Sequence, residues 1–188
     1  MDTTVDAIFD PFNDRKARDI RNSLSSALVS DLAIEKGTAI DEVAGAWKSQ
    51  ELAPIYLGYI QQTLVRYRQV AAQIKSAHVE DPKLQALLLW NAGLFFELHE
   101  LLETVWRGSQ GGAHTGLKGL IQAAGVYVHQ LRGDTAAAQG LARRARRNLI
   151  AGRHHLAFVA DLDRLIQSLS DPSRPPPVLR TATSLRPS

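Results

Sequence analysis

Histidine and carboxylate side chains recur at helical spacing between residues 95 and 106. His99 and Glu103 are four residues apart, and Glu100 and Glu103 are three apart, so in a helix these three side chains share one stripe. Such a set can ligate a divalent metal or exchange protons with a substrate. Large aromatic residues occupy the same stripe, which indicates that the acids are partly buried. A buried carboxylate is costly unless it is paired, hydrogen-bonded or bound to a metal.

Three interpretations of this stripe remain open. His99, Glu100 and Glu103 are candidate metal ligands, although His-Glu-x-x-Glu differs from the Glu-x-x-His of diiron bundles and the His-Glu-x-x-His of zinc proteases. A divalent metal is therefore a candidate cofactor, and the site would need further ligands from another helix. The second interpretation is a metal-free acid–base site that uses His99 with one of the two glutamates. The third is a structural hydrogen-bond network that fixes the register of a neighbouring helix.

The next helix along the chain supplies the expected partners of the stripe. If the glycine-rich segment before it closes an antiparallel hairpin centred near Gly111, Gln122 lies level with Glu100, and we expect Gln122 to be the polar partner of the acids. Gly119 and Gly125 lack Cβ atoms and so permit close approach of the two helices. The polar cluster that these arguments assemble comprises Glu97, His99, Glu100, Glu103, Trp106, Gln122 and His129.

The same residues carry a resemblance to a known family. Over about residues 84–150 the chain carries several motifs in a fixed order. They are an aromatic pair, then Glu-x-His-Glu-x-x-Glu-x-x-Trp, then Gly-Leu-Ile-Gln-x-Ala, and finally a histidine and Gly-Asp. In order and spacing they resemble an uncharacterised prokaryotic helical family called domain of unknown function 309. This chain has Asp134 where the family pattern has an asparagine. The resemblance implies an α-helical bundle, and it brings no settled activity or cofactor. Enzymatic activity is left undecided.

A basic segment gives a separate hypothesis. Arg143 and Arg147 share one helix face and Arg144 lies beside them, so several phosphate contacts are possible. The alternative is a solvated helix face, favoured because no aromatic residue interleaves the arginines to stack on bases. Residues 1–106 carry 10 basic and 15 acidic residues, net −5, whereas residues 107–188 carry 12 and 4, net +8. The basic half can equally dock on the acidic half of the same chain or of a second copy, so a homodimer is a candidate partner.

Periodicity and helix-stop signals define the elements that must position these side chains. We expect helices at about residues 14–36, 38–47, 51–77, 81–107, 117–131, 134–150 and 152–169, with a glycine-rich loop at 107–116. The fold class is therefore all-α, a multihelical bundle around a central antiparallel hairpin of residues 82–107 and 117–132. We expect a helical segment at 1–80, the family-like domain at 81–170, and a proline-rich, disordered or short polyproline tail at 171–188.

The composition excludes several classes of protein. The 188 residues include no cysteine, so disulfides, thiolate zinc sites and cysteine nucleophiles are excluded. An acidic N-terminus and the lack of an apolar run of 18 residues favour a cytoplasmic protein without a membrane partner. No dinucleotide-binding glycine motif, P-loop or serine-hydrolase elbow is present. The expected function is the binding of a metal or a small polar ligand, with a structural or protein-interaction module and nucleic-acid binding as alternatives.

Overall fold

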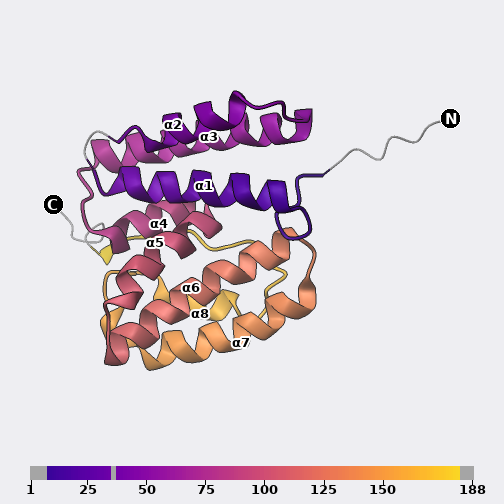
Figure 1. Ribbon diagram of the computed structural model, residues 1–188. Coiled ribbons are helices and arrows are strands. Elements are labelled where there is room, and N and C mark those ends of the chain that lie inside the picture. The colour runs from indigo at the N-terminus through magenta and orange to yellow at the C-terminus, as the bar shows by residue number, and fades with distance from the viewer. Residues whose placement is uncertain (1–7, 35–36, 183–188) are drawn as a thin grey trace. The chain divides into compact units, whose positions relative to one another are not determined.

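The computed structural model describes residues 8–34 and 37–182 (Figure 1). These residues form eight α-helices and one short 3-10 helix, and they contain no β-strand, only an isolated bridge between Val159 and Thr181. The predicted all-α class is therefore confirmed. The elements in chain order are α1 (Arg15–Leu32), α2 (Ala39–Lys48), α3 (Pro54–Ser76), α4 (Pro82–Asn91), α5 (Phe95–Arg107), α6 (Gly111–Leu131), α7 (Thr135–Ala151), η1 (Arg153–His155) and α8 (Leu162–Ser168).

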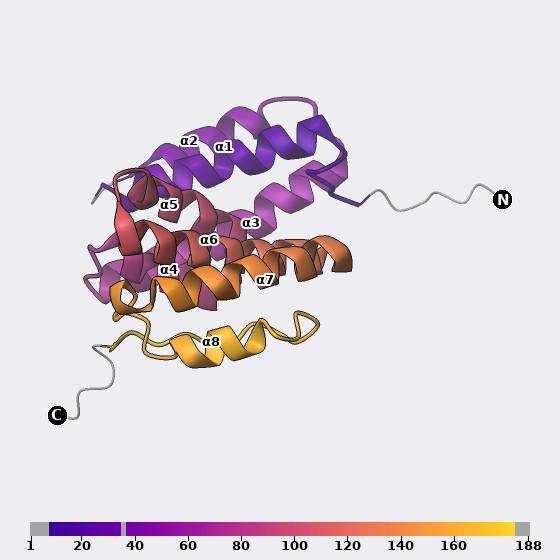
Figure 2. The same cartoon turned by 90° about the horizontal axis from the view of Figure 1, so that it is seen from below.

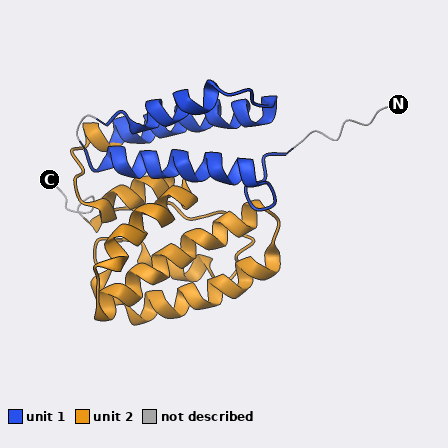
Figure 3. Ribbon diagram, in the orientation of Figure 1, with its two compact units in different colours: residues 1–73 blue, residues 74–188 orange. Residues whose placement is uncertain are grey.

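The chain divides into two compact units, Met1–Gln73 and Ile74–Ser188, which Figure 3 colours separately. The division falls in the last turn of α3, whereas the sequence placed the end of an N-terminal segment at residue 80. All residues of the predicted polar cluster and the basic helix lie in the second unit.

Two aspartates organise the helices of the first unit. Asp14 caps α1 by accepting a hydrogen bond from the Lys16 amide at 2.8 Å, and it also accepts one from the Tyr56 hydroxyl at 2.6 Å. The Tyr56 hydroxyl holds the pKa of the Asp14 carboxyl below its ordinary value. Asp31 accepts hydrogen bonds from the amides of Ala39 and Ile40 at 2.9 and 3.0 Å, so it caps α2 from the end of α1.

In the second unit, the single helix predicted for residues 81–107 is in fact two helices. The predicted start is confirmed, since Asp81 accepts a hydrogen bond from the Lys83 amide at 2.9 Å. The helix then stops, because Gly93 takes a φ of +68° and the Leu94 amide donates back to the Leu89 carbonyl at 2.9 Å. That closure is the usual helix end with a glycine in the left-handed region. The apolar periodicity continues through the break and concealed it.

Helices α6 and α7 form the closest helix pair of the second unit and lie side by side in Figures 1 and 2. A Cβ added at Gly119 would lie 2.7 Å from the backbone nitrogen of Leu149. One added at Gly116 would lie 3.0 Å from the carbonyl oxygen of Gly152, just beyond α7. The two backbones can approach this closely only because these positions carry no side chain.

This contact corrects two predictions. The most extensive hairpin is α6–α7, closed at Gly133 and Asp134, whereas the predicted hairpin of residues 82–107 and 117–132 corresponds to the smaller packing of α5 on α6. The predicted loop at residues 107–116 is also too long, because α6 begins at Gly111. Glycine lowers helix propensity by about 1 kcal/mol. Packing of this segment against Gly152 and Leu156 outweighs that preference.

The described part of the proline-rich tail, residues 171–182, packs on its own unit. The sequence analysis expected a disordered or short polyproline segment here. Leu179 is 2% exposed, and the Trp90 indole nitrogen donates to the Pro177 carbonyl at 2.7 Å. Prolines exclude this segment from a helix, but the carbonyls of a proline-rich chain remain available as hydrogen-bond acceptors.

Among the described residues, none of the helices combines the length and the apolar character that crossing a lipid bilayer requires.

The close α6–α7 contact predicts opposite effects for two glycine substitutions. Gly119→Ala should lower the free energy of unfolding by about 1–3 kcal/mol, because the new Cβ forces the two helices apart. Gly140→Ala in α7 is the matched control: its Cβ would meet nothing closer than 4.0 Å, so the better helix propensity should raise stability by up to about 1 kcal/mol. Urea unfolding followed by circular dichroism measures both. Equal effects of the two substitutions would contradict the assigned contact.

Candidate functional site

Three ionisable side chains of α5 form a ladder along one helix stripe. The His99 Nε2 atom lies 3.2 Å from Glu103 Oε1, and the Arg107 guanidinium donates to Glu103 Oε2 at 2.8 Å. The side chains of His99 and Glu103 are 36% and 30% exposed, and that of Arg107 is 72% exposed. The predicted convergence of His99 and Glu103 is thus present, and Arg107, which the sequence analysis did not include, completes the ladder. Glu100, the third residue of the predicted stripe, is half-buried.

Aromatic rings flank the ladder at both ends. The Phe96 ring lies parallel to the His99 imidazole, with 6.4 Å between centroids. At the other end the Trp106 indole stacks on the imidazole of His114 from α6, with 4.3 Å between centroids. Trp106 Nε1 and His114 Nδ1 are both buried, and neither has a hydrogen-bond partner within the described residues.

Glu97 lies apart from the ladder. It is 5% exposed, in the first turn of α5 on the side that faces the core with Leu98 and Leu101. A carboxylate in the first turn of a helix is favoured by the helix dipole. Glu97 therefore belongs to the packed side of α5 and not to the half-exposed stripe.

Gln122 has a different partner from the predicted one. Its side-chain oxygen accepts a hydrogen bond at 2.7 Å from the side-chain nitrogen, Nδ2, of Asn148 in α7. The register argument considered only the pairing of α6 with α5. Helix α6 also pairs with α7 around Gly133 and Asp134, and this second pairing brings Gln122 level with the end of α7. For the same reason Gly119 and Gly125 approach α7, where added Cβ atoms would meet Leu149 and Leu141. The Arg132-Gly133-Asp134 turn was the signal that could have identified Asn148.

His129 pairs at the turn between α6 and α7. Its Nδ1 lies 3.6 Å from Asp134 Oδ2, a distance that allows an ion pair when the imidazole is protonated but is too long for a hydrogen bond. Asp134 also caps α7, accepting from the Ala137 amide at 3.0 Å. The structure therefore assigns His129 to the helix turn and does not place it with the α5 ladder.

The predicted three-ligand metal set is not assembled in the described part of the chain. There, no three histidine, aspartate or glutamate side chains form a group that could hold a metal ion, and the set of His99, Glu100 and Glu103 is included in that finding. The physical reason is visible at Glu103, whose two oxygens are directed to His99 and Arg107 within the same helix.

The arginines of α7 form a second surface feature. Arg143, Arg144 and Arg147 are exposed, and none of them makes an ion pair with a described residue. The buried stripe of α7, formed by Ala138, Ala142, Ala145 and Leu149, occupies the opposite side of the helix. The arginines therefore point away from the α6–α7 contact.

The observed partner of Gln122 predicts a specific energetic coupling. In a double-mutant cycle, Gln122→Ala and Asn148→Ala should couple by about 1 kcal/mol, since the hydrogen bond is half-buried. The matched cycle of Gln122→Ala with Glu100→Ala tests the pairing expected from the sequence and should be additive within about 0.5 kcal/mol. Urea unfolding of the single and double variants measures both couplings. Stronger coupling to Glu100 would contradict the assigned partner.

Comparison with models of protein families gives a match within the second unit. Residues 84–141 match the family model described as Domain of unknown function (DUF309). The matched segment runs from α4 into α7 and contains the α5 ladder, Trp106, His114 and Gln122. No curated protein and no solved structure matches the chain. Over residues 84–141 the chain therefore resembles the DUF309 family, as its sequence motifs predicted.

Proposed function

We propose that the second unit binds a small polar ligand beside the α5 ladder, with Trp106 and His114 as the central contacts. The observation that carries this proposal is the pair of buried ring nitrogens, Trp106 Nε1 and His114 Nδ1, that have no hydrogen-bond partner among the described residues. A buried polar group without a partner costs about 1–3 kcal/mol, so folded proteins contain few of them. A ligand atom that accepts a hydrogen bond would remove that cost.

The chemistry of the donors restricts the ligand. The Trp106 indole nitrogen can only donate, so the ligand must present an acceptor such as a carbonyl or carboxylate oxygen. Arg107 has further N–H groups beyond the one given to Glu103, and a guanidinium binds a carboxylate in a planar, two-point geometry. A small carboxylate therefore matches both the orphaned donor and the exposed end of the ladder. His99 and Glu103 add a proton-exchanging pair next to it.

A structural or protein-interaction role for the polar residues is the rival proposal. It is supported by the internal pairing of Glu103 and by the Gln122–Asn148 hydrogen bond. It leaves the two ring nitrogens unexplained, which is why ligand binding is preferred.

The three tryptophans provide an internal control for the ligand test. The indole nitrogens of Trp47 and Trp90 are already engaged, donating to Ser23 and to the Pro177 carbonyl at 2.7 Å each, whereas that of Trp106 is not. In ¹⁵N NMR spectra, titration with a panel of small carboxylates and amides, beginning with acetate and acetamide, should move the Trp106 indole resonance alone. Trp106→Phe assigns that resonance and should abolish binding.

Two outcomes would contradict ligand binding at this place. One is a Trp106 resonance that no member of the panel moves; the other is an equal response of all three indoles. Addition of EDTA should leave the response unchanged, because the described residues do not assemble a metal site. A response lost in EDTA and in Glu103→Gln would instead support the metal interpretation of His99, Glu100 and Glu103.

A second candidate function is binding of nucleic acid through α7. The observation in its favour is that Arg143, Arg144 and Arg147 are exposed and make no ion pair with a described residue of the second unit. Between residues 111 and 153 the only acidic residue is Asp134, so the local field of the α6–α7 hairpin is positive.

Salt dependence tests this second function. Replacing Arg143, Arg144 and Arg147 with glutamine should abolish binding to duplex DNA at low salt, and the native chain should lose affinity steeply as salt rises. Each phosphate contact removed should reduce the slope of log K against log salt by about 0.9. Fluorescence anisotropy with a labelled duplex measures both effects. The control is Arg68→Gln, whose guanidinium pairs with Asp41 in the first unit; no binding by the native chain at low salt would refute the function.

A further inference from the structure

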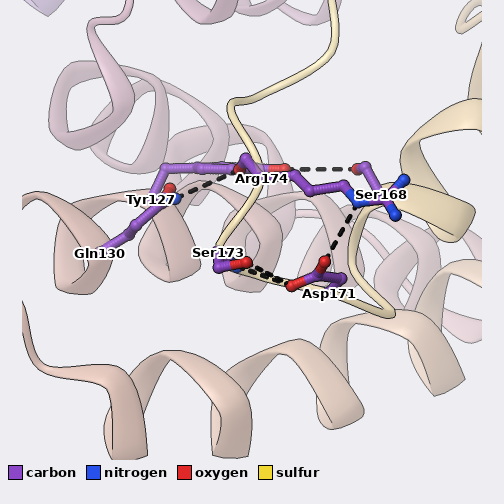
Figure 4. Close-up of polar contacts among 6 residues, drawn as sticks. All are labelled: Tyr127, Gln130, Ser168, Asp171, Ser173 and Arg174. Carbon is purple, nitrogen blue, oxygen red and sulfur yellow. Dashed lines mark hydrogen bonds and ion pairs between the residues drawn. The ribbon is translucent and has the colours of Figure 1, made fainter.

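The described C-terminal segment, residues 174–182, lies across the second unit and is here called the strap. It follows α8 after a turn in which Asp171 accepts hydrogen bonds from the Ser173 amide at 3.2 Å and from the Arg174 guanidinium at 3.1 Å (Figure 4). The side-chain nitrogen of Gln130 in α6, Nε2, donates to the Arg174 carbonyl at 3.2 Å, at the point where the strap begins. Figure 4 also shows Tyr127 beside Ser168, with 3.3 Å between their hydroxyl oxygens.

Side chains of α4 recognise the main chain of the strap. Trp90 Nε1 donates to the Pro177 carbonyl at 2.7 Å in a buried contact. Asn91 bonds both sides of one residue: its amide nitrogen donates to the Leu179 carbonyl at 2.7 Å, and its oxygen accepts from the Leu179 amide at 2.9 Å. Hydrogen bonds to the backbone are available to any extended segment that presents the same groups.

The strap side chains alternate between buried and exposed. Pro177 and Leu179 are buried, whereas Val178 between them is 61% exposed. The rings of Trp90, Phe95 and Tyr127 meet pairwise at 5.2–5.3 Å between centroids, and the Trp90 indole of this aromatic cluster contacts the strap at Pro177. Backbone hydrogen bonds combined with pockets for alternate side chains are the two components by which folded domains bind extended peptides.

The end of the strap adds a short antiparallel pairing and a charge contact. The Ala160 amide donates to the Arg180 carbonyl at 3.0 Å, and the Ala182 amide to the Phe158 carbonyl at 3.1 Å. The Arg180 guanidinium binds both carboxylate oxygens of Asp161, at 2.9 and 2.6 Å. These hydrogen bonds hold the pKa of the Asp161 carboxyl below its ordinary value. A basic residue one position after the buried leucine thus completes the contacts of the strap with its own unit.

We infer that this groove, formed by Trp90, Asn91, Gln130, Ala160 and Asp161, is a peptide-binding site for an extended Pro-x-Leu-Arg segment of a partner protein. The strap occupies it within the same chain and competes with the partner. The charge of Asp161 selects a basic residue at the fourth position, and the buried environments of Pro177 and Leu179 select apolar residues at the first and third. This site uses none of the residues assigned above to small-ligand or nucleic-acid binding.

The test is direct binding of a peptide to the full chain. The probe is a fluorescein-labelled peptide with the sequence of residues 173–182. Leu179→Asp in the protein puts a carboxylate into the buried pocket and releases the strap, so the peptide should bind this variant at least about tenfold more tightly than it binds the native chain. The native groove is filled by a tethered competitor whose effective concentration is in the millimolar range. Fluorescence anisotropy measures both affinities.

A charge exchange provides the specificity control. In the Leu179→Asp background, Asp161→Arg should lose the native peptide and gain a peptide in which the position of Arg180 carries aspartate. A peptide with aspartate at the position of Leu179 should bind neither protein. If Leu179→Asp does not fold by circular dichroism, Arg180→Ala, which removes only the exposed charge contact, replaces it and should raise peptide affinity by about threefold.

Three results would overturn the inference. The first is a folded, strap-releasing variant that does not bind the native peptide. The second is equal binding of the native peptide and the Leu179-substituted peptide. The third is a concentration-dependent dimer of the native chain that excludes the peptide, because the occupant would then be the strap of a second copy.

Discussion

The close contact between α6 and α7 is the constraint on which the second unit depends. Gly116, Gly119 and Gly152 let the two backbones meet, and any side chain at these positions would occupy the space of Leu149, Leu156 or a main-chain carbonyl. Once the two helices are fixed in this register, Gln122 faces Asn148 and His129 lies beside Asp134. At the start of the same helix α6, His114 stacks on Trp106 near the end of α5.

Local sequence signals predicted the elements of this fold better than their pairing. The Asp81-Pro82 cap and the Arg132-Gly133-Asp134 turn act within a few residues and are where the sequence placed them. The break at Gly93 was missed because the apolar pattern continues on both sides of it. The glycines at the start of α6 were interpreted as a loop because their helical state depends on a packing partner some 40 residues away, which local propensity does not contain.

The candidate site was predictable to the extent that it follows from one helix. The His99–Glu103 pair results from a four-residue spacing and is present. Arg107 extends the same spacing and could have been included. Contacts between helices were less accessible: Gln122 was assigned to the wrong neighbour, and His114 was placed in a loop. The packing of the strap was the least predictable feature, because it depends on the Trp90 indole and the Asn91 side-chain amide of α4, which lie far from the strap in the sequence.

The two-sided contact of Asn91 with Leu179 also explains how a segment with three successive prolines keeps one alignment. Prolines 175, 176 and 177 are chemically alike, and the Trp90 indole N–H could donate a hydrogen bond to the carbonyl of any of them. Asn91, however, requires a residue that offers both an amide hydrogen and a carbonyl, and proline has no amide hydrogen. Sliding the segment by two residues would place Pro177 opposite Asn91 and lose one hydrogen bond. Asn91 therefore fixes the register of the segment relative to the end of the proline run.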